Sequence, residues 1–166
     1  MIYAGIGARD APEYYLRKIR ALSEILENNN HRLRSGGAKG CDQTFMRSSN
    51  NAVIYKPWKG FDIGRTNPAW RIVEEPTDEA IDFACRYHNN RTPWVLRLHG
   101  RNTHIILGDN LKEKVDFCIC YTLKGKQRGG TGVALRILEA KKIPTYNLGN
   151  MKFDEIISSL ALNGII

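Results

Sequence analysis

Two glycine-rich segments contain the residues whose types and spacing best suit the binding of a phosphate group. Residues 35–42 read SGGAKGCD and residues 124–132 read KGKQRGGTG, and each segment follows a short apolar strand of the expected fold. Glycines let the backbone approach a ligand, and free amides at the start of a following helix attract phosphate oxygens. Each segment is also compatible with a plain tight turn. The predicted phosphate contacts are Ser35, Gly36, Gly37, Lys39, Gly40 and Asp42 in the first segment, and Lys126, Arg128, Gly129, Gly130 and Thr131 in the second.

A third glycine-containing segment, residues 5–10, reads GIGARD and follows the first apolar run of the chain. Arg9 suits a bidentate pair with a phosphate, with Gly7 and Ala8 beside it, and it suits a surface ion pair with a neighbouring carboxylate equally well. Trp58 lies in a long basic segment, where a tryptophan either stacks on a nucleobase or anchors the loop by local packing. We count all four residues as candidate ligand contacts.

The motifs disfavour several common classes of site. Neither long segment ends in the Gly-Lys-Ser/Thr of a Walker motif, and neither shows G-x-G-x-x-G with an acidic residue about 20 positions later, which disfavours an NAD-dependent dehydrogenase. The spacing of Cys85, His88, His99 and His104 does not match a zinc site. No serine or cysteine nucleophile stands beside an evident base. We therefore predict no metal, no cofactor and no catalytic residue.

Short apolar strands that alternate with amphipathic helices must position these segments. The sequence predicts an α/β, Rossmann-like fold, with a parallel sheet of about five strands and helices on both faces. In such sheets ligands bind at the carboxyl ends of the strands, where the strand order reverses. Strands are expected at 1–5, 31–34, 52–55, 115–121 and 144–148, and helices after a cap at Asp10, from 41, at 77–88, 93–98, 132–141 and 153–162, with a less regular insert at 56–110 that includes a long loop at 56–71.

Composition sets the broad class. The chain has 166 residues and a formal net charge of +8, which favours an anionic partner such as a nucleotide, nucleic acid or phosphate. No apolar run has the length of a membrane span, and the first residues do not resemble a signal peptide. We therefore expect a cytoplasmic protein with reduced cysteines and no membrane partner. Cys118 and Cys120 are two apart in a predicted strand, which places both on one side.

Together the three segments resemble the SLOG superfamily, which is named for the Smf/DprA DNA-processing proteins and the LOG phosphoribohydrolases. The resemblance rests on GIGAR at 5–9, SGGAKGCD at 35–42 and GGTG at 129–132, and it is weakest from 56 to about 108. The SGGAKG-x-D element is typical of the DprA-like members. The resemblance implies a single nucleotide-binding domain over residues 1–166 and a homo-oligomer. Because small stand-alone members are common in phages, it also implies a phage protein in the host cytoplasm.

One motif departs from the catalytic members of that superfamily. The LOG-type enzymes carry Pro-Gly-Gly-x-Gly-Thr-x-x-Glu, in which the glutamate serves in cleaving an N-glycosidic bond. Here Arg128 stands at the proline position, Val133 at the threonine and Arg136 at the glutamate, with Glu139 three residues further. The resemblance therefore implies that the binding part of the motif is kept and the catalytic part is lost.

Three functions follow from this comparison. The first is non-catalytic binding of a phosphorylated nucleotide, as a phage sponge that sequesters an NAD-derived defence signal such as cyclic ADP-ribose or an ADP-ribose conjugate. The second is a nucleoside-monophosphate N-glycosidase or phosphoribohydrolase, which would need a substitute acid or base such as Asp42, Asp109 or Glu139. The third is DprA-like binding of single-stranded DNA, which the +8 charge favours and the lack of a basic run disfavours.

Overall fold

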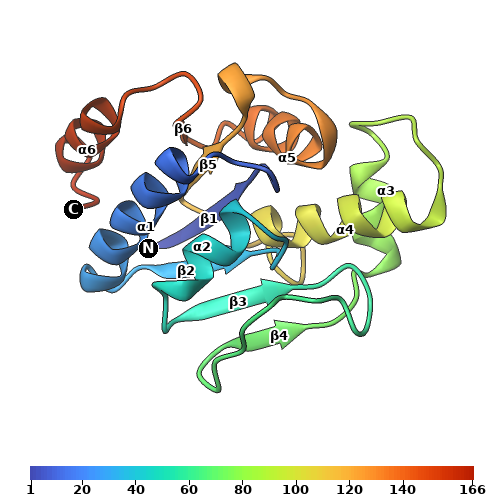
Figure 1. Ribbon diagram of the computed structural model, residues 1–166. Helices are drawn as coiled ribbons and strands as arrows, with labels where there is room; N and C mark the ends of the chain where they lie inside the picture. The colour runs from blue at the N-terminus through green and yellow to red at the C-terminus, as the bar shows by residue number, and fades with distance from the viewer.

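A six-stranded parallel sheet forms the centre of the molecule (Figure 1), in a computed structural model that describes residues Met1–Ile166. The strand order is β4-β3-β2-β1-β5-β6, and every neighbouring pair is parallel. The strands are β1 (Ile2–Gly7), β2 (Arg32–Ser35), β3 (Ala52–Tyr55), β4 (Arg71–Val73), β5 (Phe117–Tyr121) and β6 (Thr145–Asn147). The α/β class, the parallel sheet and the Rossmann-like arrangement are as the sequence predicts.

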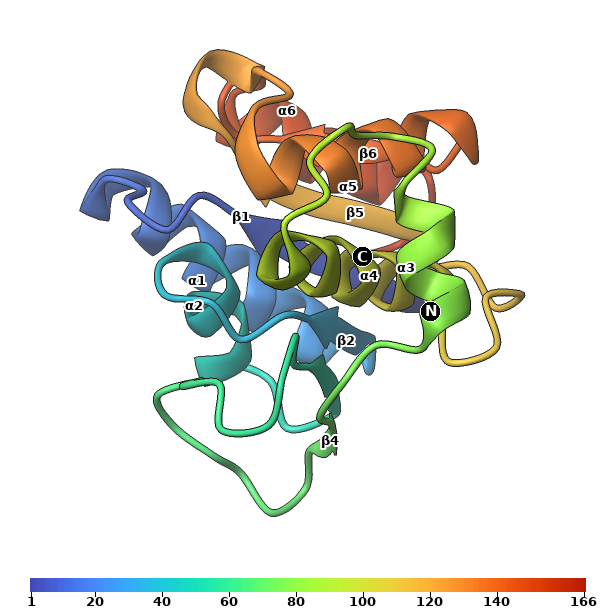
Figure 2. The same cartoon turned by 90° about the vertical axis from the view of Figure 1, so that its right-hand side faces the viewer.

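Helices cover both faces of this sheet. The helices are α1 (Glu13–Asn28), α2 (Cys41–Arg47), α3 (Asp78–Ala84), α4 (Pro93–Leu107), α5 (Gly129–Ala140) and α6 (Phe153–Leu162), with a short 3-10 turn η1 (Leu123–Gly125). Helices α1, α2 and α6 contribute to one core, and α4 and α5 to the other. Figure 2 shows α3, α4 and α5 in front of the sheet, with α3 packed on α4.

The alternation of side chains along the strands separates these two cores. Tyr3 of β1 faces the α1 side, where its ring stacks on Phe117 with 5.7 Å between the centroids. Ala4 faces the α5 side together with Cys118 and Cys120, which are buried and free, so the prediction that these two cysteines share a side is confirmed. No helix is long and apolar enough to cross a membrane.

The sequence misplaces several element boundaries. Helix α1 begins after Pro12 without a side-chain cap, so Asp10 is not its N-cap. Thr77 caps α3 as predicted, through a 3.3 Å bond from the Ala80 amide to its Oγ1, but that helix ends at Ala84. Strand β4 begins at the last residue of the expected 56–71 loop and lies in the 56–110 insert, where no strand was expected. Helix α4 continues nine residues beyond the predicted end at 98, and α5 begins at 129, three residues before the predicted start at 132.

Strand order reverses between β1 and β5. From β1 the chain adds β2, β3 and β4 on one side, and it then crosses to add β5 and β6 on the other. The loops after β1 and β5 therefore leave the sheet in diverging directions. A crevice between two such loops is the usual ligand position in open α/β sheets.

Candidate functional site

A cleft of about 540 Å³ opens at the carboxyl ends of β1 and β5. Its walls are the loop after β1, the loop that contains η1, the first turn of α5 and the cleft-facing side of α4. The candidate residues that line it are Gly7, Ala8, Arg9, Asp42, Lys126, Arg128, Gly129, Gly130 and Thr131. The topology thus brings the 5–10 and 126–132 segments together at the expected edge of the sheet.

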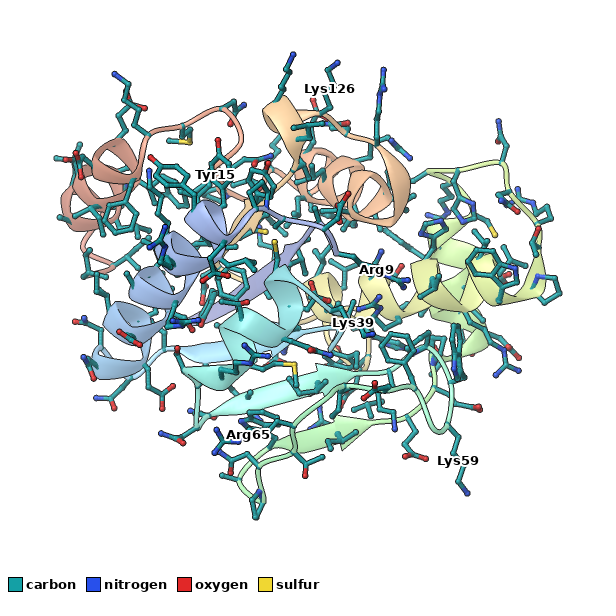
Figure 3. The ribbon with its side chains drawn as sticks, viewed as in Figure 1. Arg9, Tyr15, Lys39, Lys59, Arg65 and Lys126 are labelled. Carbon is teal, nitrogen blue, oxygen red and sulfur yellow. The ribbon has the colours of Figure 1, made fainter.

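The remaining candidate contacts lie outside the walls of the cleft. Ser35 is buried, and its hydroxyl donates a 2.6 Å bond to the Gly5 carbonyl. Lys39 is exposed, and Figure 3 draws it close to Arg9. Trp58 packs edge-on against Phe61, with 5.3 Å between the ring centroids, so local anchoring accounts for this tryptophan. The glycines Gly36, Gly37 and Gly40 also do not line the cleft.

Asp42 occupies the start of α2. Its Oδ1 accepts a 3.2 Å bond from the Gly7 amide, and its Oδ2 accepts 3.3 Å bonds from the Ala38 amide and from Arg101 Nη1. Asp42 is 4% exposed and Arg101 is 6% exposed. Burial raises the pKa of the Asp42 carboxyl, and the attraction of Arg101 opposes that rise. The Asp42 carboxylate therefore accepts the amide of Gly7, a residue that the sequence analysis counted as a candidate ligand contact.

Glycine in the 35–42 segment permits close packing around this carboxylate. A Cβ on Gly36 would lie 1.2 Å from Arg101 Nη1, so only glycine leaves room for the guanidinium. A Cβ on Gly40 would lie 2.5 Å from the carbonyl oxygens of both Ala8 and Arg9. The 35–42 segment therefore supports the 5–10 segment, and it holds the loop after β1 in position.

The first turn of α5 is the least satisfied part of the cleft wall. No side chain caps this helix, and its first turn contains no acidic residue. The Gly132 amide is the first to bond within the turn, to the Arg128 carbonyl at 3.0 Å, which leaves the amides of Gly129, Gly130 and Thr131 without a backbone acceptor. Free amides at a helix start carry partial positive charge and favour an anion. This turn has the properties that the sequence analysis assigned to it.

Basic side chains surround that turn. Arg9, Lys126 and Arg128 are exposed and make no ion pair, and all three line the cleft. Figure 3 shows Arg9 near the middle of this edge of the sheet and Lys126 projecting from the loop after η1. The carboxylates in the wall are Asp10, which is exposed, and Asp42, which is paired with Arg101. Cations therefore outnumber carboxylates in the cleft.

Helix α4 supplies wall residues that the sequence analysis did not assign to the site. Trp94 is 57% exposed at the first turn of α4, and Leu98 and Arg101 follow it in the same wall. The spacing i, i+4 and i+7 places these side chains on one helical face. This spacing, with Thr92-Pro93 as a helix start, is the signal that could have identified them. Asn102 also lines the cleft, and its Nδ2 donates to the Gly130 carbonyl at 3.0 Å.

Other residues singled out in the sequence have structural partners. His104 is buried, and its Nε2 accepts a 3.1 Å bond from the Thr77 amide. Arg136 donates from Nε to the Tyr87 carbonyl at 3.0 Å. Asp109 pairs with Arg71, and Glu139 accepts from Gln127; neither carboxylate lines the cleft.

Comparisons with known proteins support the fold alone. No family model matches the sequence, and no curated protein is significantly similar to it. A solved structure of DNA processing protein A from Helicobacter pylori, described for its single-stranded DNA binding mode, superimposes with a TM-score of 0.60. The two chains are 17% identical, and the alignment covers 99% of this chain and 73% of the other. The fold is thus Rossmann-like with a DprA-like structural neighbour.

Proposed function

We propose that the cleft binds a phosphorylated nucleotide, with a phosphate at the first turn of α5. The observation that supports this most directly is the uncapped turn itself. Its residues Gly129, Gly130 and Thr131 line the cleft, their amides have no backbone acceptor, and the turn contains no acidic residue. A phosphate there would accept these amides and gain from the helix dipole. Arg128 and Lys126 add charge on the same side of the cleft.

The α4 part of the cleft wall suits the base of such a ligand. Trp94 presents an exposed ring, and Leu98 lies one turn further along α4. Stacking of a nucleobase on an exposed aromatic ring is favourable and tolerates any base. The cleft therefore combines a phosphate-binding end and an apolar, aromatic wall, which is the combination that a nucleotide requires.

Within this proposal the protein acts by holding its ligand. Asp42 is buried and shared by three donors, which suits a structural role better than proton transfer. The LOG-type glutamate position is Arg136, which bonds the Tyr87 carbonyl. Sequestration of an NAD-derived signal, such as cyclic ADP-ribose or an ADP-ribose conjugate, is the form of this function that we favour.

Isothermal titration tests the proposal directly. AMP, ADP, ADP-ribose and cyclic ADP-ribose isomers are titrated into the protein, and at least one is expected to bind with a one-to-one stoichiometry. Arg128→Ala should weaken that binding, whereas Lys114→Ala serves as the control, because Lys114 is exposed just before β5 at the opposite edge of the sheet. The proposal fails if none of these compounds binds. Chromatography of the recovered nucleotide separates binding from the N-glycosidase alternative, since free base would appear only if the bond is cleaved.

A second candidate function is binding of single-stranded DNA. The structural neighbour is described for that activity, and basic side chains continue beyond the cleft. Figure 3 draws Lys39 close to Arg9 and Lys59 at the lower right, whereas Arg65 lies at the lower left, near the other end of β3 and β4. Fluorescence anisotropy of a labelled oligonucleotide at two salt concentrations tests this candidate. Affinity should fall steeply with salt, because each neutralised phosphate releases counterions.

A further inference from the structure

Arg101 is a buried cation in the cleft wall that has more donors than partners. It is 6% exposed, and Nη1 donates to Asp42 Oδ2 at 3.3 Å, while Nε has no hydrogen-bond partner. A guanidinium has five N–H donors, so a single bond leaves most of them unused. A buried charge with unused donors is costly unless another acceptor reaches it. Arg101 therefore has unused N–H donors that could bind an anion.

Asp42 is a poor candidate to supply the missing acceptors. Both of its oxygens are already engaged by backbone amides, Gly7 on Oδ1 and Ala38 on Oδ2. The pair holds the loops after β1 and β2 together, and Asp42 divides its charge among three donors. Burial lowers the pKa of Arg101, and Asp42 opposes that change. The positive charge of Arg101 is therefore incompletely satisfied within the protein.

Arg101 is also held in a fixed place relative to the first turn of α5. The guanidinium lies against Gly36, where any side chain would collide with Nη1. The next residue, Asn102, bonds the Gly130 carbonyl at 3.0 Å. One cleft thus contains two groups that favour an anion, the start of α5 and Arg101, joined through adjacent residues of α4.

We propose that Arg101 contacts a second phosphate, so that the preferred ligand carries a diphosphate: a nucleoside diphosphate or a pyrophosphate-linked nucleotide. This inference rests on the proposed function and narrows its ligand class. One phosphate lies at the first turn of α5, and the other lies against the guanidinium. Planar guanidinium donors suit phosphate oxygens in this role.

The first test compares ligands on the unaltered protein. Adenosine, AMP, ADP and ADP-ribose are titrated under one condition, and ADP and ADP-ribose are expected to bind at least about tenfold more tightly than AMP. Equal affinity for AMP and ADP would overturn this inference and leave the proposed function standing. Absence of binding by all four would overturn the proposed function itself.

The second test changes Arg101. In R101Q the ratio of the ADP affinity to the AMP affinity should fall from at least about tenfold to about one. The double variant D42N/R101Q should behave in the same way, because it removes the buried carboxylate that R101Q leaves without its cation. R97Q is the matched control on the same helix, since Arg97 is exposed and pairs with Glu75 at 3.1 Å. An equal loss for AMP and ADP in R101Q and in the double variant would show a structural role only, and would overturn the inference.

Discussion

The Asn102 side-chain amide donates to the Gly130 carbonyl at 3.0 Å, which fastens the middle of α4 to the first turn of α5. Both elements line the cleft. Because the first turn of a helix lacks part of the hydrogen bonding of its interior, one external bond helps to fix its orientation. The bond therefore connects a buried residue of α4 to the turn of α5 that carries the free amides.

Asn102→Ala should loosen the first turn of α5. We expect a loss of about 1 kcal/mol in the free energy of unfolding, which is typical of one side-chain hydrogen bond, and a weaker affinity for AMP. Asn163→Ala is the control, because Asn163 makes a similar bond to the Ser159 carbonyl on α6, far from the cleft. Urea unfolding and titration measure the two effects. If both variants bind AMP equally well, the Asn102 bond does not organise the site.

Two glycine variants separate the roles of the two glycine-rich segments. Gly130→Val places a side chain in open cleft space, since a Cβ there meets no atom within 4 Å. We expect this variant to lose nucleotide binding, while its free energy of unfolding stays within about 0.5 kcal/mol of the parent's. Gly37→Val should instead destabilise the fold by more than about 2 kcal/mol. Gly37 has a φ of +72°, and its Cβ would lie 2.4 Å from Ile63 Cγ2.

Thermal melting and titration of both variants check this contrast. A Gly130→Val protein that is folded and binds as tightly as the parent would argue against a phosphate at α5. A Gly37→Val protein with an unchanged melting temperature would contradict the packing argument.

The sequence predicts the parts of this fold that depend on local patterns. Strand β3 at Ala52–Tyr55 and helix α6 at Phe153–Leu162 have the predicted bounds, because an uninterrupted apolar run and a clear helical period determine them locally. Strand β4 was missed because it has three residues, and two of them are exposed at the sheet edge. An edge strand this short contains too few alternating apolar residues for a sequence pattern to predict it.

Helix α4 shows why part of the site could not be predicted. Residues 99–104 of this helix read HGRNTH and contain no large apolar side chain, so the helical pattern is lost after residue 98. In the structure these residues are buried, and several of their polar groups are paired, some with distant parts of the chain. Their partners include the His99 carbonyl for Thr103, Asp42 for Arg101, Gly130 for Asn102 and Thr77 for His104. Hydrogen bonds between residues far apart in the sequence depend on the whole fold, so a local sequence pattern does not predict them.

The fluorescence of Trp94 should change when a nucleotide binds. The chain has three tryptophans; Trp70 is buried and donates to the Ser49 carbonyl at 2.7 Å, and Trp58 packs on Phe61. Base stacking on exposed Trp94 should quench its fluorescence, and Trp94→Ala should cost about 1–3 kcal/mol of binding free energy. Trp58→Ala is the matched control and should leave both the quench and the affinity unchanged. If the quench survives in Trp94→Ala, the base does not stack on this residue.

A pair of histidines behind the cleft wall should make the stability of the fold depend on pH. His88 and His99 have ring centroids 4.2 Å apart, and His99 Nδ1 is buried without a partner. Burial lowers the pKa of His99 to about 4, with further contributions from His88, Arg101 and Arg136. The unfolded chain takes up this proton near pH 6.5, whereas the folded protein resists it until about pH 4. The stabilising effect of the neutral ring is therefore present above pH 6.5 and is lost as the pH falls from 6.5 to 4.

His99→Gln tests this dependence, because glutamine is polar and does not titrate. The free energy of unfolding of the parent protein should fall on acidification by about 1–2 kcal/mol more than that of the variant. Urea unfolding of both proteins at pH 7.5, 6.0 and 4.5 measures the difference. His31→Gln is the control, since His31 bonds the Ile165 carbonyl on the other side of the sheet. Parallel stability curves for the parent and His99→Gln would show that the folded protein and the unfolded chain take up the His99 proton at the same pH. That result would contradict a pKa lowered by burial.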